Sequence, residues 1–124
     1  MAAYEHLLKS CDTRDQLDEI ASADPPAYLH RCFAEGAATP SLSFARVQQL
    51  AVCAMVLDSI IDDRDYESFE PELIADWRAH HGTACARLKD AALAALRRAR
   101  GGLAAEDPEA AAELEELEHR LVPA

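Results

Sequence analysis

Residues 44–65 read FARVQQLAVCAMVLDSIIDDRD, and this stretch decides the fold of the chain. An uninterrupted apolar run covers residues 50–57, and aspartates follow it almost at once. The apolar residues recur at spacings of three and four, and further apolar residues fill the opposite side of the same helix. A helix that is apolar on every side has to be surrounded by other helices. We therefore predict an all-α, single-domain bundle of five to six helices over residues 1–124, built around a central buried helix at about 44–64.

Prolines and glycines set the expected bounds of the other helices. Proline suits the first helical turn and glycine suits the helix end, so Pro25 is expected to begin a helix that Gly36 ends. In the same way, Gly101 and Gly102 are expected to end a long helix. The helices predicted outside the central one cover residues 3–10, 14–21, 25–36, about 70–100 and about 107–121.

The long helix contains one ambiguous point at Gly82. A single glycine costs only about 1 kcal/mol inside a helix, which favours a continuous helix with a weakened middle. The alternative, in which residues 80–82 break it into two helices, stays open.

The chain is strongly acidic, with 23 acidic residues against 12 basic ones and a formal net charge of −11. Binding to a phosphate backbone needs clustered positive charge, so we expect no direct nucleic-acid binding. The charge is also uneven, because residues 87–100 are mainly basic and residues 106–118 are acidic. We expect these two segments to neutralise one another within the chain or to face water.

Four cysteines, Cys11, Cys32, Cys53 and Cys85, are spread along the chain without a Cys-x-x-Cys pair. No basic segment leading into an apolar run begins the sequence, so we expect no secretory signal. The longest apolar run is also far shorter than the roughly 18 residues that span a bilayer. We therefore expect a cytoplasmic protein without membrane association, with free thiols, and with Cys53 and Cys85 in its core.

The acidic residues that follow the apolar run are the first candidate site. They are Asp62, Asp63, Asp65, Glu67 and Glu70. Dense charge of one sign speeds association with a complementary surface. We expect these carboxylates to bind a basic surface on a partner protein.

The C-terminal helix offers a second candidate surface, formed by Leu114, Leu117 and Leu121. This heptad-like seam is narrower than the apolar face of an ordinary core helix. It either packs back on its own chain or joins a second chain. Residues 103–124 are thus a candidate dimerisation or partner-binding segment, with the leucines as its apolar anchor.

A metal site is the alternative from a different functional class. Asp58 and Asp62 are one helical turn apart on the central helix, as are Asp76 and His80 on the next. A hairpin of the two helices would bring these side chains together, and carboxylates with imidazole inside a bundle bind Mn, Fe or Mg. Against this alternative, a di-iron carboxylate site needs two Glu-x-x-His motifs, and this chain has one.

The sequence contains no glycine-rich phosphate loop, nucleophile elbow or His-Glu-x-x-His motif. We therefore expect a small acidic binding or regulatory protein, such as an adaptor, immunity protein or inhibitor, rather than an enzyme, and we expect no cofactor. A metal-binding bundle or small enzyme that uses Asp58, Asp62, Asp76 and His80 is the alternative.

Overall fold

Six α-helices make up the described part of the chain, and no strand occurs in it. The structure is a computed structural model that describes residues 13–38, 43–62 and 69–122. The helices are α1 (Thr13–Ser22), α2 (Pro25–Ala38), α3 (Phe44–Asp62), α4 (Pro71–Ala86), α5 (Lys89–Leu103) and α6 (Pro108–Leu121). The all-α prediction is confirmed, whereas the helix predicted at residues 3–10 lies outside the described residues.

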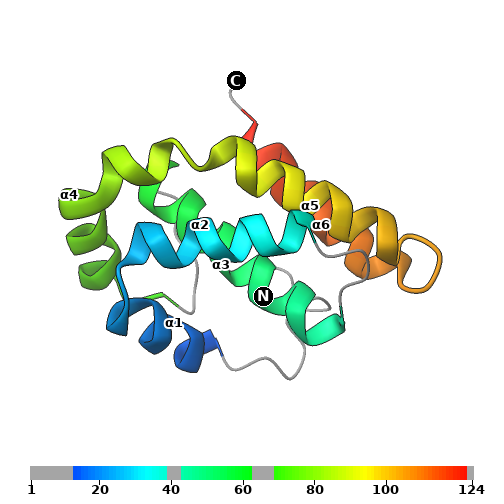
Figure 1. Cartoon of the computed structure of the whole chain (residues 1–124), viewed down its shortest axis with the longest axis horizontal. Coiled ribbons are helices and arrows are strands. Elements are labelled where there is room, and N and C mark those ends of the chain that lie inside the picture. The colour runs from blue at the N-terminus through cyan, green and yellow to red at the C-terminus, as the bar shows by residue number, and fades with distance from the viewer. Residues whose placement is uncertain (1–12, 39–42, 63–68, 123–124) are drawn as a thin grey trace.

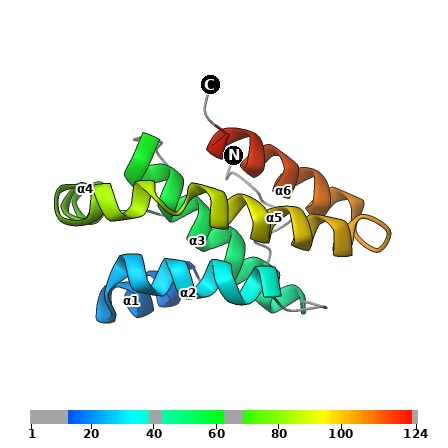
Figure 2. The same ribbon diagram turned by 45° about the horizontal axis from the view of Figure 1, so that its top comes forward.

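Helix α3 forms the centre of the bundle (Figure 1). Residues 51–60 are all buried, and α3 packs against each of the other five helices. In Figure 2 it crosses the molecule diagonally, with α1 and α2 on one side and α6 on the other. The Ser43 hydroxyl accepts a hydrogen bond from the Arg46 backbone N–H at 3.2 Å and thereby caps the first turn. The prediction of a central buried helix is confirmed.

Helix α3 is also the one described helix that is long and apolar enough to cross a bilayer. It has 19 residues, and its 18-residue window has a mean hydropathy of 1.4. The apolar run itself is far shorter than 18 residues, and the helix reaches this length because it continues beyond the run at both ends. The rest of the chain buries 67% of this window, as it does in the core helix of a soluble protein.

The prediction of one long helix at about 70–100 is wrong, because the helix is interrupted at Arg87 and Leu88. There the backbone N–H groups bond to carbonyls three residues back, Arg87 to Ala84 at 3.3 Å and Leu88 to Cys85 at 2.9 Å. The break follows from packing. Helix α4 contacts chiefly α3, whereas α5 contacts chiefly α6 and α2, so each half buries its apolar stripe against different neighbours. Gly82, the expected weak point, lies inside α4.

Three glycines expected to end helices lie inside them instead. Helix α2 continues past Gly36 to Ala38, and α5 continues past Gly101 and Gly102 to the buried Leu103. A Cβ at position 36 would meet Ala95 Cβ and Leu50 Cδ1, both at 3.4 Å. Gly36 therefore permits close approach of α2 to α3 and α5, and it does not act as a stop signal.

Helix α6 packs back on its own chain, mainly against α5. Asp107 caps it by accepting a hydrogen bond from the Ala110 backbone N–H at 3.2 Å. Its three seam leucines, Leu114, Leu117 and Leu121, are each 0% exposed. The intrachain alternative therefore describes this structure, and the seam offers no exposed apolar anchor to a second chain.

Candidate functional site

The acidic residues after the apolar run do not all face solvent. Asp58 is 0% exposed, because neighbouring helices enclose its side of α3. The expectation that the end of α3 directs all its aspartates to the exterior is therefore wrong for this residue. Asp62, the last residue of α3, is exposed and lies 3.7 Å from the Lys89 ammonium. Glu70, directly before α4, is exposed as well. Of the other predicted partner-binding residues, Asp63, Asp65 and Glu67 lie outside the described residues.

Arg78 fixes the position of α4 against the end of α3. Its Nε donates to the Ile60 carbonyl at 2.9 Å, and its Nη2 donates to the Ser59 carbonyl at 2.7 Å. Carbonyls in the last helical turn lack partners within the helix, and a cation there is also favoured by the helix dipole. The middle of α4 is therefore held beside the carboxyl end of α3.

Four exposed carboxylates lie at the end of α3, directly before α4 and along the first half of α4. We name Asp62, Glu70, Glu72 and Asp76 the acidic junction. Ile74 and Trp77 form the inward face of α4, which leaves Glu72 and Asp76 directed to solvent. Sequence reasoning found Asp62 and Glu70 for this surface but had assigned Asp76 to a metal site.

The four residues of the metal alternative do not form a cluster. Asp58 is enclosed in the core, whereas Asp76 and His80 lie on the exposed side of α4. His80 Nδ1 is 2.9 Å from the Asp76 carbonyl and 3.2 Å from its carboxylate, a contact within one helical turn. Among the described residues, no three His, Cys, Asp or Glu side chains are grouped so as to hold a metal ion. The predicted metal set is therefore wrong.

The basic and acidic segments near the C-terminus neutralise one another at Glu118. This carboxylate is only 4% exposed, and it accepts hydrogen bonds from Nε and Nη2 of Arg100. Arg97 Nε lies 3.5 Å from it. Its hydrogen bonds to Glu118 raise the pKa of the Arg100 guanidinium. Two arginines of α5 are thus paired with a carboxylate of α6, as the charge pattern predicted.

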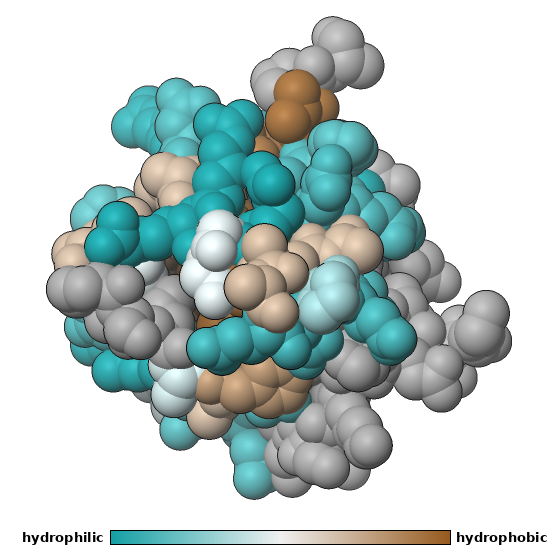
Figure 3. Space-filling view, turned by 90° about the vertical axis from the view of Figure 1, so that its right-hand side faces the viewer, coloured by the Kyte–Doolittle hydropathy of each residue, from teal (hydrophilic) through white to brown (hydrophobic). Residues whose placement is uncertain are grey.

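Apolar surface is scarce on the described part of the molecule. The large hydrophobic residues that are exposed there are Phe44, at 38%, and Val122, at 44%. Figure 3 shows the end of the molecule that carries the turn between α5 and α6, where hydrophilic residues predominate and apolar ones form small separate areas. An apolar docking surface is therefore not available among these residues.

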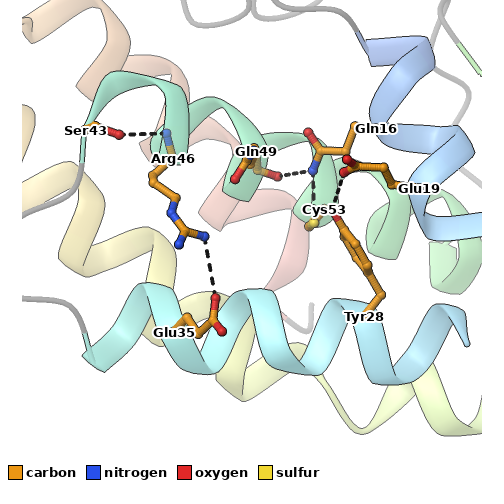
Figure 4. A network of polar contacts seen from close by, with 8 residues as sticks. All are labelled: Gln16, Glu19, Tyr28, Glu35, Ser43, Arg46, Gln49 and Cys53. Atoms are coloured by element: carbon orange, nitrogen blue, oxygen red, sulfur yellow. Dashed lines mark hydrogen bonds and ion pairs between the residues drawn. The ribbon is translucent and has the colours of Figure 1, made fainter. Parts of the chain in front are cut away.

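A polar cluster joins α1, α2 and α3 on the other side of the bundle (Figure 4). The buried Gln16 donates from Nε2 to the Gln49 carbonyl at 2.8 Å and to Cys53 Sγ at 3.3 Å. The Tyr28 hydroxyl donates to the Glu19 carboxylate at 3.1 Å, and burial is the main reason that the Tyr28 pKa is raised. This cluster ties the short helix α1 to the core.

Two cysteines on α2 and α3 are buried to different degrees. Cys32 on α2 is partly buried against the core, whereas Cys53 on α3 is fully buried. The prediction that Cys53 lies in the core is confirmed.

Comparison of the chain with protein-family models, with curated proteins and with solved structures gives no match.

Proposed function

We propose that the protein is a small acidic binding or regulatory protein, an adaptor, immunity protein or inhibitor, whose acidic junction binds a basic surface on a partner protein. The observation that carries the proposal is the absence of an apolar docking surface on the described residues. Phe44 and Val122 are isolated, and the leucine seam of α6 is buried. Recognition through this part of the chain then has to use charged groups.

The charge distribution supports the acidic junction as the contact surface. The chain carries a net charge of −11, and the arginines of α5 nearest to α6 are engaged by Glu118. Exposed carboxylates of one sign increase the rate of encounter with a basic partner and contribute to its specificity. Asp63, Asp65 and Glu67, which connect α3 to α4 in the sequence, add three more acidic residues to the same segment.

The composition suggests where the protein works. The chain uses ten arginines but two lysines, and it is rich in alanine, a bias typical of GC-rich genomes. We place it in the cytoplasm of a bacterium or in a phage, where free thiols persist in the reducing environment.

Charge reversal at the acidic junction tests this function. The variant E70K/E72K changes two exposed carboxylates that precede or begin α4. The control E106K/E115K makes the same change in net charge at exposed positions beside and on α6. Each protein is immobilised and used to capture proteins from a lysate of its native host.

The proposal predicts a basic protein that the wild type and the control retain and that E70K/E72K does not. The retained amount should fall as salt rises, since exposed charges are screened. Equal retention by all three proteins, or retention that salt does not affect, would contradict it. Circular dichroism of the two variants verifies that both stay folded.

A further inference from the structure

Helix α6 is joined to the bundle by one short connection. A turn at residues 104–106 follows α5, and the Leu103 carbonyl holds it by accepting from the backbone N–H groups of Glu106 at 3.1 Å and Asp107 at 2.8 Å. Figure 2 shows α6 at the edge of the bundle, where it packs chiefly against α5 and to a lesser extent against α3. We name residues 104–122 the C-terminal arm. Only this turn links the arm covalently to the helices that it covers.

The surface that α6 covers combines apolar contacts with a charged pair. The leucine seam of α6 is fully buried against it, and Glu118 is bound there by Arg97 and Arg100. The two arginine side chains are 59% and 37% exposed, so all three charges regain water when α6 leaves. A buried ion pair adds little net stability, because desolvation offsets the attraction, and its best-attested effect is to specify the partner helix and its register.

Gly101 and Gly102 weaken the last turn of α5, directly before the arm. Both are exposed, neither has the left-handed backbone that favours glycine, and a Cβ at either position would find no packing neighbour within 4 Å. The close packing that accounts for Gly36 therefore does not account for these two. Each glycine lowers helix propensity about fivefold relative to alanine. Together they favour local opening of this turn, as in the low-stability segments that move in folded proteins.

Release of the arm exposes two complementary surfaces in the same chain. One is the leucine seam of α6, and the other is the surface of α5 and α3 that the seam covers. Apolar surface brought into water favours a new contact. A second copy of the chain supplies both surfaces, with Glu118 and its two arginines in the same places. It therefore restores each contact that the released arm has lost, which makes exchange of an identical element a low-cost route to a dimer.

We propose that the C-terminal arm opens at Gly101 and Gly102 and exchanges between two copies of the chain, so that α6 of each copy packs on α5 and α3 of the other. The acidic junction belongs to α3, α4 and the residue between them, and none of its residues lies in the arm. The exchanged dimer therefore carries two acidic junctions, a consequence that rests on the proposed function. The exchange itself does not depend on that function.

Charge reversal across the contact between α5 and α6 gives a test that requires exchange. E118R places a cation against Arg97 and Arg100, and R97E/R100E places two carboxylates against Glu118. Each variant alone has like charges in this contact, whether α6 packs on its own chain or on an identical copy. In a mixture, exchange gives both contacts opposite charges. We expect a one-to-one heterodimer by native mass spectrometry, with more helix by circular dichroism than the average of the separate proteins.

E116R is the matched control, because Glu116 is exposed on the same helix. In this variant Glu118 still matches the arginines of its own chain. Mixing E116R with R97E/R100E therefore relieves no repulsion and should give no heterodimer. Equal heterodimer formation by E116R and E118R, or none by E118R, would overturn the proposal.

The wild-type chain tests exchange independently of how the charge variants fold. After incubation at millimolar concentration, light scattering should detect a dimer that returns slowly to monomer on dilution, because the return requires the arm to open. G101A/G102A should slow this return by up to about 25-fold, the product of two fivefold effects on the turn. A wild type that stays monomeric at every concentration, or an equally fast return in G101A/G102A, would contradict the exchange.

Salt separates this dimer from the partner complex of the acidic junction. Each copy carries a net charge of −11, so screening of their repulsion should raise the dimer fraction. The partner complex is expected to weaken under the same conditions. A dimer that salt dissociates would therefore show that the two copies associate through opposite surface charges and not through exchanged arms.

Discussion

Arg78 of α4 donates a hydrogen bond from Nε to the backbone carbonyl of Ile60 in α3 at 2.9 Å. A second bond from the same guanidinium reaches the neighbouring Ser59 carbonyl. The end of the central helix is therefore completed by a side chain from another helix, and this contact holds the middle of α4 beside it.

Removal of the Arg78 guanidinium should lower the stability of the fold. Two carbonyls at the end of α3 would lose charged donors, and hydrogen bonds to charged groups contribute about 1.5–3 kcal/mol each in favourable cases. Because Arg78 is only partly buried, we expect R78Q to reduce the free energy of unfolding by about 1–2 kcal/mol. R78K, which keeps the charge but loses the forked geometry, should fall between R78Q and the wild type. Urea unfolding measures all three, and an R78Q midpoint equal to that of the wild type would contradict this role.

Glycine substitutions should have opposite effects at two helical positions. At Gly82 a new Cβ would meet Arg78 Cγ at an ordinary 3.8 Å, so G82A should stabilise the protein by about 1 kcal/mol through helix propensity. At Gly36 the space is closed by Ala95 and Leu50, so G36L should destabilise it by about 1–3 kcal/mol through overpacking. Thermal unfolding of both variants checks the pair. A stabilising G36L would show that α2 does not approach α3 and α5 this closely.

Replacing a buried leucine of the central helix by alanine should be the most destabilising of these core changes. Leu57 is 0% exposed, and replacing a buried leucine by alanine costs about 2–5 kcal/mol through lost burial and a residual cavity. L73A on α4 is a matched control, because Leu73 is only partly buried against the core. L57A should therefore shift the urea midpoint further than L73A does, and the reverse order would contradict the central position of α3.

The buried thiol of Cys85 should make stability fall at alkaline pH. Burial raises its pKa from the ordinary value of 9.0 to about 11 in the folded chain. Above pH 9 the unfolded chain releases this proton while the folded chain retains it, so the unfolded state is favoured increasingly up to about pH 11. Two pKa units correspond to about 2.7 kcal/mol, which is the upper limit of this effect.

The variant C85A isolates that contribution, because the other thiols and Tyr28 titrate in both proteins. Its stability at neutral pH should be lower through the lost sulfur contacts, but its decline between pH 9 and about 11 should be shallower. If the free energy of unfolding fell equally with pH in C85A and the wild type, Cys85 would not be buried as the structure shows.

Neutralisation of Glu118 should cost more than neutralisation of Glu116, although both carboxylates lie on α6. Glu118 is enclosed and bound by Arg97 and Arg100, whereas Glu116 forms an exposed pair with Arg120 on the same helix. Exposed pairs of this kind contribute about 0.3–0.5 kcal/mol, so E116Q should be nearly neutral. Chemical unfolding of E118Q and E116Q makes the comparison, and equal midpoints would contradict the structural role of Glu118.

Much of the fold was accessible from local sequence features. The apolar run at residues 50–57 predicted the central helix, and Pro25 predicted the start of α2. Each of these signals acts within a few residues, so neighbouring helices do not alter it. The neutralisation of α5 by α6 also followed from their opposite charges.

The errors concern features that depend on packing between distant segments. No sequence signal near Arg87 marks the interruption between α4 and α5. The interruption arises because the two helices pack against different neighbours. Gly36 resembles a stop signal but allows close helix contact. Asp58 is polar in the sequence, yet helices from elsewhere in the chain enclose it.

The affinity of the captured partner for the acidic junction tests the functional claim most directly. The dissociation constant is measured by titration at low and at physiological salt for the wild type, E70K/E72K and E106K/E115K. We expect E70K/E72K to bind at least about tenfold more weakly than the wild type, a loss of about 1.4 kcal/mol. We also expect E106K/E115K to bind nearly as well as the wild type and salt to weaken the wild-type complex. Unchanged affinity of E70K/E72K at both salt concentrations would contradict the assignment of the acidic junction as the binding surface.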